Sequence, residues 1–191
     1  MFKTISEAGC KIKIAFGHKM GVGKDAACSH LINKYGGKHL SFAMPLYDIQ
    51  RYAQQKCGFL EEKDRQFLQY IGTEWARNKD PDVWVRLALQ DHMQDENIFL
   101  SDLRFKNEFY ALKKDGWFCV KIVRPNENQE NQEVQNRKGT GRNDHESETS
   151  LDAIDDKEWN YIIYNDKSIQ DFYNNLDNLY LNIWRSKMNN T

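Results

Sequence analysis

Apolar and polar residues along this chain are grouped in blocks whose spacing predicts strands alternating with helices. Residues 11–16 alternate and then become apolar, which is typical of a strand, and a helical spacing of apolar residues follows over 25–35. The same analysis predicts strands over 39–42, 98–100, 118–123 and 159–164, and helices opened by Pro45 and Pro81 and over 61–77, 107–114 and 169–184. Such alternation favours a parallel sheet covered by helices on both faces, so we predict a three-layer α/β fold.

One stretch differs in character from the rest of the chain. Residues 125–150 are polar, rich in Asn, Gln, Glu and Arg, and cannot contribute to a core. We expect this segment to be mobile or to be ordered only by a ligand. The chain has 191 residues, which is the length of one domain. We therefore predict a single domain, 1–191, with 125–150 as a mobile polar lid.

Charge and cysteine content exclude several classes of protein. The formal net charge of −1 offers no basic face for nucleic acid, and no apolar run approaches the roughly 20 residues that span a bilayer. The four cysteines, Cys10, Cys28, Cys57 and Cys119, form no CxxC pair and lack zinc-ligand spacing, so we expect free thiols in a reducing compartment. These observations predict a soluble cytoplasmic protein without nucleic-acid or membrane partners. Sheets of this type often expose an edge that dimerises, which favours a homodimer.

A glycine-rich turn with a lysine lies between the first strand and the first helix, and reads Gly17-His18-Lys19-Met20-Gly21-Val22-Gly23-Lys24-Asp25. Glycines let the backbone amides point at phosphates, and the following helix adds its positive end. Lys24 is placed to reach the terminal phosphates of a nucleotide. The turn departs from the pattern G-x-x-x-x-G-K-[ST], because His18 replaces the first glycine and Asp25 replaces the hydroxyl that ligates magnesium. The Asp25 carboxylate can take over that role.

A second polar motif follows the strand over 98–100. Asp102 lies at the carboxyl end of that strand, where it can hold a metal ion or water opposite the phosphate loop. Arg104 can bind a substrate phosphate through two hydrogen bonds. The alternative is that Asp102 caps the next helix and that Arg104 pairs with Glu108.

The helix predicted over 61–77 carries groups that suit a nucleotide. Arg65 and Gln69 are four residues apart and share one face, and Arg77 and Trp84 follow nearby. Arginine suits a phosphate, glutamine a base edge and an aromatic ring a stacked base. A solvated face of a charged helix would show the same spacing. The apolar face of this helix is predicted to be Phe67, Leu68, Ile71 and Trp75.

Arginines flank or lie in the polar segment. On a closing lid, Arg124, Arg137 and Arg142 would neutralise the charge of a transferred phosphoryl group. His145 offers an acid or a base, although a surface histidine fits equally well. Residues 147–151 are alternatively the start of a helix, and the whole segment is alternatively a disordered loop with incidental arginines.

These motifs, in this order, resemble the deoxynucleoside monophosphate kinases of bacteriophages and large DNA viruses. The resemblance covers most of the chain and rests on Gly23-Lys24-Asp25, on residues 41–46 (SFAMPL), on 65–77 followed by Asp82-Val83-Trp84, on 102–108 (Asp-x-Arg-Phe-x-Asn-Glu), on 121–125 and on 145–148. The chain departs from the family at His18, where glycine is expected, and at Ala26, where threonine is frequent.

The resemblance implies a P-loop kinase with a central parallel sheet and a mobile lid. It implies transfer of the γ-phosphoryl group of ATP to a deoxynucleoside 5′-monophosphate, with Mg²⁺, in the host cytoplasm for a viral protein. The implied catalytic residues are Lys24, Asp25, Asp102 and Arg124, with Asp25 and Asp102 on the metal. The implied ATP-binding residues are Gly17, Lys19, Met20, Gly21, Val22, Gly23, Lys24, Asp25 and Ala26. The implied substrate-binding residues are Phe42, Arg65, Gln69, Thr73, Arg77, Trp84, Arg104, Asn107 and Glu108, and the lid residues are Arg137, Arg142 and His145.

Two other functions fit the same residues. A P-loop kinase for another phosphorylated acceptor, such as phosphomevalonate or dephospho-coenzyme A, would share the architecture. A nucleotide-binding protein without transfer activity would share the phosphate loop.

Overall fold

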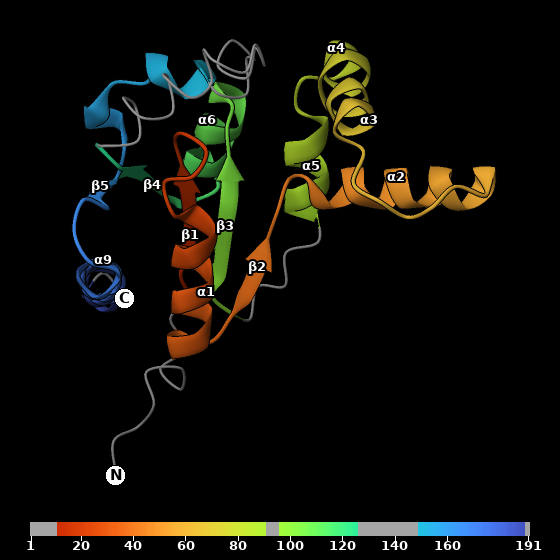
Figure 1. The fold of residues 1–191 in the computed structure, drawn as a ribbon. Coiled ribbons are helices and arrows are strands. Elements are labelled where there is room, and N and C mark those ends of the chain that lie inside the picture. The colour runs from red at the N-terminus through yellow and green to blue at the C-terminus, as the bar shows by residue number, and fades with distance from the viewer. Residues whose placement is uncertain (1–10, 91–95, 126–148, 190–191) are drawn as a thin grey trace. The chain divides into compact units, whose positions relative to one another are not determined.

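The computed structural model describes residues 11–90, 96–125 and 149–189, and the chain divides into two compact units (Figure 1). Unit 1 comprises Met1–His39 and Gln94–Thr191, and unit 2 comprises Leu40–Met93. Strands and helices follow one another along the chain in the predicted order, with a run of consecutive helices between β2 (Lys38–Leu40) and β3 (Ile98–Leu103). Whether the whole chain behaves as one domain stays a prediction.

Unit 1 is built on a five-stranded sheet in the order β2-β3-β1-β4-β5. The pairings of β1 with β3, of β1 with β4 and of β4 with β5 are all parallel, which confirms the predicted parallel sheet. The carboxyl ends of these strands therefore meet at one edge, where ligands bind in such folds. The strands are β1 (Lys13–Gly17), β2 (Lys38–Leu40), β3 (Ile98–Leu103), β4 (Phe118–Val123) and β5 (Tyr161–Tyr164).

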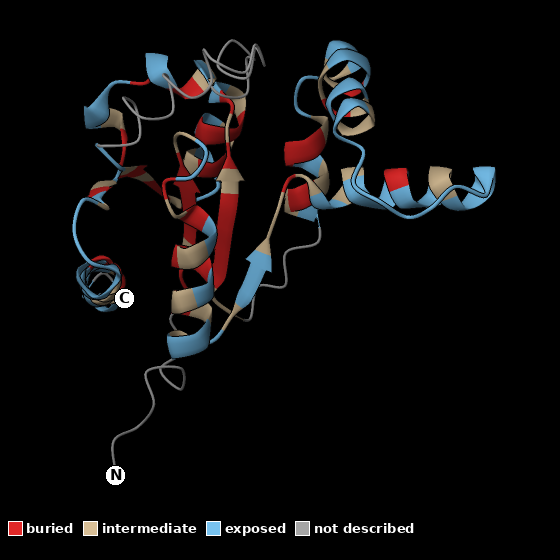
Figure 2. Ribbon diagram, viewed as in Figure 1, coloured by how far each residue is buried: buried red, intermediate tan, exposed pale blue. Residues whose placement is uncertain are grey.

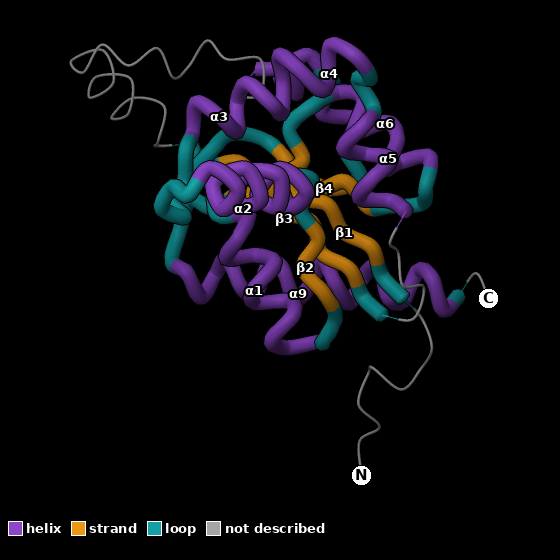
Figure 3. Tube along the Cα trace, turned by 90° about the vertical axis from the view of Figure 1, so that its right-hand side faces the viewer, coloured by secondary structure: helices purple, strands orange, loops and turns teal. Residues whose placement is uncertain are grey.

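Helices cover both faces of this sheet because successive strand side chains point to opposite sides. Ile14 and Phe16 of β1 pack into a core with α1 (Lys24–Tyr35) and α9 (Ile169–Met188), which lie together on one side of the strands in Figure 3. On the other face, the Cys119 thiol donates a hydrogen bond to the Phe109 carbonyl of α6 (Lys106–Lys114) at 3.9 Å. The three predicted layers are therefore confirmed.

A polar cluster joins α1 to α9. The Asp177 carboxylate accepts hydrogen bonds from His30 (2.9 Å), Lys34 (2.6 Å) and Tyr35 (3.1 Å), and the His30 ring stacks on Tyr173. Burial opposes the ionisation of Asp177, but the hydrogen bonds from Lys34, His30 and Tyr35 outweigh it, so the pKa of Asp177 is lowered. The cluster therefore holds α1, which begins at the phosphate loop, against the C-terminal helix α9.

Unit 2 consists of helices only. These are α2 (Met44–Cys57), α3 (Arg65–Gln69), the π-helical turn η2 (Tyr70–Trp75), α4 (Ala76–Lys79) and α5 (Val83–Gln90). Trp84 is 2% exposed, and its indole N–H donates to the Gly72 carbonyl at 2.8 Å, which ties α5 to η2. Gly72 lies against Leu46 of α2, since a Cβ at Gly72 would approach Leu46 Cδ1 to 3.0 Å. Trp84 and Gly72 thus form the centre of this unit.

The helix predicted over 61–77 begins at Arg65 and contains a π-helical turn that was not predicted. Asp64 caps its start by accepting a hydrogen bond from the Phe67 amide at 3.0 Å, so the helix begins at Arg65. The π-helical turn then shifts the faces, so that Gly72 and Ala76 are buried while Trp75 is 45% exposed. The prediction that Trp75 lies on the buried apolar face was wrong, because the sequence pattern does not indicate a π-helical turn.

The described residues also bear on membrane-spanning helices and on the cysteines. None of the helices in the described parts of the chain has the length and apolar character needed to span a bilayer. Cys28 and Cys119 are buried free thiols and Cys57 is an exposed one, as predicted, while Cys10 lies outside the described residues.

Candidate nucleotide site

The phosphate loop is formed as predicted, between the end of β1 and the start of α1. Gly21 and Gly23 have φ values of 82° and 108°, a conformation that L-residues with a side chain rarely adopt. Gly17 is required for another reason, since a Cβ there would lie 2.7 Å from Cη2 of Trp159. Local backbone geometry and one distant ring thus shape the loop.

His18 adopts the conformation of the glycine that it replaces. Its φ is 100°, and it is the one non-glycine residue with positive φ within the described ranges. Burial and the nearby Lys121 and Lys19 lower the pKa of His18 to about 4, against the opposing effect of Asp152. His18 is therefore neutral at physiological pH, and the described residues offer its Nδ1 no hydrogen-bond partner.

Lys24 lies inside the loop that it follows. It is 8% exposed, and its ammonium group donates to the His18 carbonyl at 3.1 Å and to the Lys19 carbonyl. These bonds hold a positive charge at the centre of the turn, next to the amino end of α1. A buried ammonium group held by backbone carbonyls is oriented for an anion without further reorganisation.

Asn165 supports the loop from a distant segment and was not predicted from the sequence. It follows β5, and its side-chain amide donates to the Val22 carbonyl at 3.0 Å while its backbone amide donates to the Val123 carbonyl at 2.8 Å. A Cβ at Gly23 would lie 2.9 Å from Asn165 Nδ2. The rule applied to Asp102, a polar residue at the carboxyl end of a strand, would have identified Asn165.

The two predicted metal ligands lie near a common buried thiol. Asp25 is an exposed residue in the first turn of α1, and Asp102 is a half-buried residue near the end of β3. Burial raises the pKa of the Cys28 thiol, and the negative charges of Asp25 and Asp102 raise it further. The carboxylates therefore belong to the same region of unit 1.

The two carboxylates are of the donor type that magnesium takes. Within the described ranges, no group of three or more His, Cys, Asp or Glu side chains is arranged to hold a metal ion by itself. Magnesium bound with a nucleotide usually takes one or two carboxylates and completes its shell with phosphate oxygens and water. Asp25 and Asp102 can supply those two carboxylates.

The motif over 102–108 contains one residue with a structural position. Glu108 is 1% exposed, and its Oε2 accepts hydrogen bonds from the backbone amides of Arg104 and Phe105, both at 2.9 Å. This carboxylate shapes the turn that presents Asp102 and Arg104 and is withdrawn from solvent. Arg104 and Asn107 are half-buried beside it.

Most of the predicted acceptor residues belong to unit 2. Arg65 and Gln69 are the first and last residues of α3 and are both exposed. Arg77 donates to the Pro81 carbonyl at 3.4 Å. Trp84 lies in the centre of the unit, which is a packing position and not that of a ring open to a stacked base. Two further predicted residues are the half-buried Thr73 of η2 and Phe42, which is 3% exposed.

The predicted lid is mostly outside the described residues. Arg124 is exposed directly after β4 in unit 1. Arg137, Arg142 and His145 lie outside the described ranges, so their roles stay predictions.

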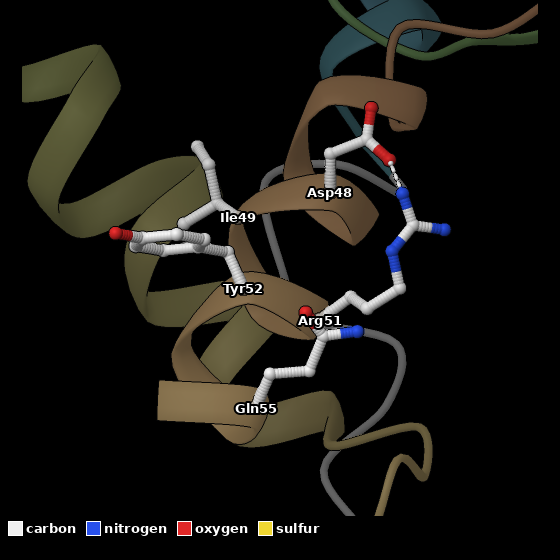
Figure 4. Close-up of a pocket in the computed structure, with 5 residues that line it drawn as sticks. All are labelled: Asp48, Ile49, Arg51, Tyr52 and Gln55. Carbon is white, nitrogen blue, oxygen red and sulfur yellow. Dashed lines mark hydrogen bonds and ion pairs between the residues drawn. The ribbon is translucent and has the colours of Figure 1, made fainter. Parts of the chain in front are cut away.

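A shallow pocket in unit 2 contains none of the predicted site residues. It is lined by α2 alone, with Ile49 and Tyr52 on one side and the Arg51–Asp48 ion pair (2.7 Å) on the other (Figure 4). Tyr52 is 63% exposed. One helix face of this kind brings together no convergent groups for chemistry, so the phosphate loop remains the candidate site.

Comparison with known sequences identifies viral relatives. No protein-family model matches the chain. It is 32% identical over 149 residues to protein ORF77 of Ictalurid herpesvirus 1 (strain Auburn), which spans 75% of this chain but only 60% of that protein. It is 28% identical over 187 residues to an Acanthamoeba polyphaga mimivirus protein described as a "putative deoxynucleotide monophosphate kinase", covering 82% of this chain and 89% of that protein. The predicted resemblance to viral deoxynucleoside monophosphate kinases is confirmed.

Comparison with solved structures identifies the fold. The dephospho-CoA kinase from Campylobacter jejuni matches 93% of this chain and all of its own with a TM-score of 0.53 at 14% identity. The shikimate kinase from Acinetobacter baumannii, solved in complex with shikimate, matches 95% of this chain and 98% of its own with a TM-score of 0.51 at 14% identity. The predicted P-loop kinase fold is confirmed, while the acceptors of these enzymes carry no weight at such identity.

Proposed function

We propose that this chain is a kinase that transfers the γ-phosphoryl group of ATP to a deoxynucleoside 5′-monophosphate, giving the diphosphate. The observation that carries the proposal is Lys24, a buried ammonium group held by loop carbonyls at the amino end of α1. The acceptor is inferred from the mimivirus relative, whose printed description names a deoxynucleotide monophosphate kinase.

The donor side of the mechanism depends on electrostatics and positioning. The amides of the glycine-rich turn and the ammonium group of Lys24 would bind the β- and γ-phosphates and stabilise the charge that develops during transfer. Asp25 and Asp102 would hold Mg²⁺, which neutralises phosphate charge when bound. Without a nucleotide, the imidazole of His18 is uncharged at neutral pH, because its pKa is lowered to about 4.

The acceptor side depends on arginines. Arg65, Arg77 and Arg104 would orient the monophosphate, and Gln69 would contact the base. Arg124, with Arg137 or Arg142, would neutralise charge on the transferring group. Because the attacking oxygen belongs to a phosphate that is already an anion, no strong general base is needed. Trp84 is assigned a packing role, since its indole N–H is engaged with Gly72.

The decisive experiment is a coupled assay for ADP release with ATP and Mg²⁺. The acceptors are the deoxynucleoside monophosphates, their ribose counterparts, phosphomevalonate and dephospho-coenzyme A. We expect turnover with at least one deoxynucleotide and a loss of about 100- to 1,000-fold in kcat for Lys24→Met, the range seen when a preorganised stabilising group is removed. Lys114→Met, the same change at the exposed end of α6, serves as the control.

Each outcome of this assay separates the candidate functions. Turnover with dephospho-coenzyme A or phosphomevalonate alone would replace the nucleotide acceptor by another phosphorylated one. ATP binding without turnover on any acceptor would support a nucleotide-binding protein without transfer activity. A cytoplasmic location and a homodimer stay predictions, and the dimer can be checked by sedimentation of the same preparation.

A further inference from the structure

A segment at the end of the predicted lid is held against unit 1 and contacts the phosphate loop through Asp152. It comprises the short helices η3 (Ser150–Ala153) and η4 (Asp156–Glu158). Leu151 and Ile154 anchor it, with 4% and 3% of their surfaces exposed. The Ser150 hydroxyl accepts a hydrogen bond from the first amide of α6, at Lys106 (3.2 Å), and Lys113 donates to the Glu158 carbonyl. Apolar and backbone contacts therefore hold this segment in place.

Asp152 projects from the segment toward the loop. Its Oδ2 forms an ion pair with Lys19 Nζ at 2.5 Å, and its Oδ1 lies 4.0 Å from Nε2 of His18. Lys19 is a residue of the phosphate loop, and its backbone carbonyl also accepts a hydrogen bond from Lys24. A carboxylate thus binds an ammonium group of the loop that is predicted to bind ATP.

We propose that Asp152 sets the affinity of the loop for the donor nucleotide by competing with its phosphates for Lys19. The proposal rests on the proposed function, since it requires a triphosphate in this loop. Asp152 is a positioning residue, because it acts on Lys19 and does not touch the reacting atoms.

Because the Lys19–Asp152 pair is partly exposed, breaking it so that Lys19 can bind a phosphate costs little free energy. The side chains of Lys19 and Asp152 are 32% and 44% exposed, and exposed ion pairs contribute only about 0.2–1 kcal/mol. A triphosphate carries more charge than one carboxylate, so it can draw the ammonium group away. The free energy of the broken ion pair is the cost that lowers the affinity of the loop for the nucleotide.

The test is the affinity of the full chain for ATP with excess Mg²⁺, measured by calorimetry for the wild type and for Asp152→Asn. The substitution keeps the shape of the side chain and removes its charge, and the anchors at Leu151 and Ile154 remain. The matched control is Asp156→Asn, which removes an ion pair of 2.7 Å with Lys121 from the same segment. Lys121 belongs to β4 and not to the loop.

We expect Asp152→Asn to bind ATP about three- to five-fold more tightly, as the loss of a half-exposed ion pair allows. The gain should shrink as salt is raised, because both competing interactions are screened. Asp156→Asn should bind within about two-fold of the wild type, since its lysine lies outside the loop. In a Lys19→Ala background, Asp152→Asn should change nothing, because the group under competition is absent.

Three results would overturn the inference. Unchanged or weaker binding by Asp152→Asn would give Asp152 a structural role. Equal tightening in the Lys19→Ala background would show that the effect does not pass through Lys19. A wild-type chain that binds no ATP would end this inference together with the kinase proposal, whereas normal ATP binding with either of the first two results would end this inference alone.

Discussion

The two units of this protein are organised by different means. In unit 1 the central strands β1 and β3 are nearly all buried (Figure 2), and the phosphate loop is shaped by backbone conformation and backbone carbonyls. In unit 2 the helix α2 has one buried residue, Gln50, and the centre depends on one indole bonded to a π-helical turn. The predicted donor residues therefore depend on backbone geometry around a buried sheet, while most of the predicted acceptor residues depend on side-chain packing between helices.

The strongest test of this contrast is Gly23→Ala. Alanine at φ 108° would be strained, and its Cβ would lie 2.9 Å from Asn165 Nδ2. We expect kcat/KM to fall by about 100-fold or more, because the amides that bind phosphate would move. Gly116→Ala is the control, since Gly116 has φ 77° with no atom within 4 Å of the added Cβ. It should lose about 1 kcal/mol of stability and no activity. Equal activity of both variants would mean that the loop is not rigid.

A second test uses the pH dependence of the stability of unit 1. The unfolded His18 takes up a proton near pH 6.5, but in the folded chain its pKa is lowered to about 4. Between these values the unfolded state binds more protons, so stability is present above pH 6.5 and is lost as pH falls toward 4. His18→Asn cannot titrate and tolerates a left-handed backbone. In urea denaturation, the wild type should lose about 1–2 kcal/mol relative to this variant over that range, less than the full shift allows because the ring is partly solvated. Parallel curves would contradict a half-buried neutral imidazole.

The smallest expected effect belongs to unit 2. Trp84→Phe keeps an aromatic ring but leaves the Gly72 carbonyl without its donor, at a cost of about 1 kcal/mol. We expect KM for the monophosphate to rise a few-fold while KM for ATP stays the same, because only the acceptor side is loosened. Trp75→Phe, at a ring that is 45% exposed, should change neither value. A rise in KM for ATP alone would reverse the assignment of the two units.

The features that depend on residues close together in the sequence could be predicted from the spacing of apolar residues and glycines. The order of strands and helices, the parallel sheet and the phosphate loop followed from periodicity and from the Gly23-Lys24 turn. The lysine could be placed because a strand, a glycine-rich turn and a helix leave few conformations. The motif containing Asp102 was found for the same reason, since it follows a buried strand directly.

Contacts between distant segments could not be predicted in this way. Asp152 pairs with Lys19, Asn165 supports Val22 and Trp159 covers Gly17, each across more than a hundred residues. The sequence around Asp152 and Trp159 carries no signal of these contacts, whereas Asn165 directly follows a strand and could have been identified by the rule applied to Asp102. The burial of Glu108 was also missed, because a carboxylate has the residue type of a ligand-binding group and its burial depends on the folded chain.

The ring of Trp159 has a consequence for recognising relatives of this chain. It leaves no room for any side chain at Gly17, whereas position 18 accommodates an imidazole. The obligatory glycine of this loop is therefore one place earlier than the usual motif has it. A search that requires glycine at position 18 would pass over such chains. A search that pairs a glycine at the end of the first strand with a tryptophan just before the last would retrieve them.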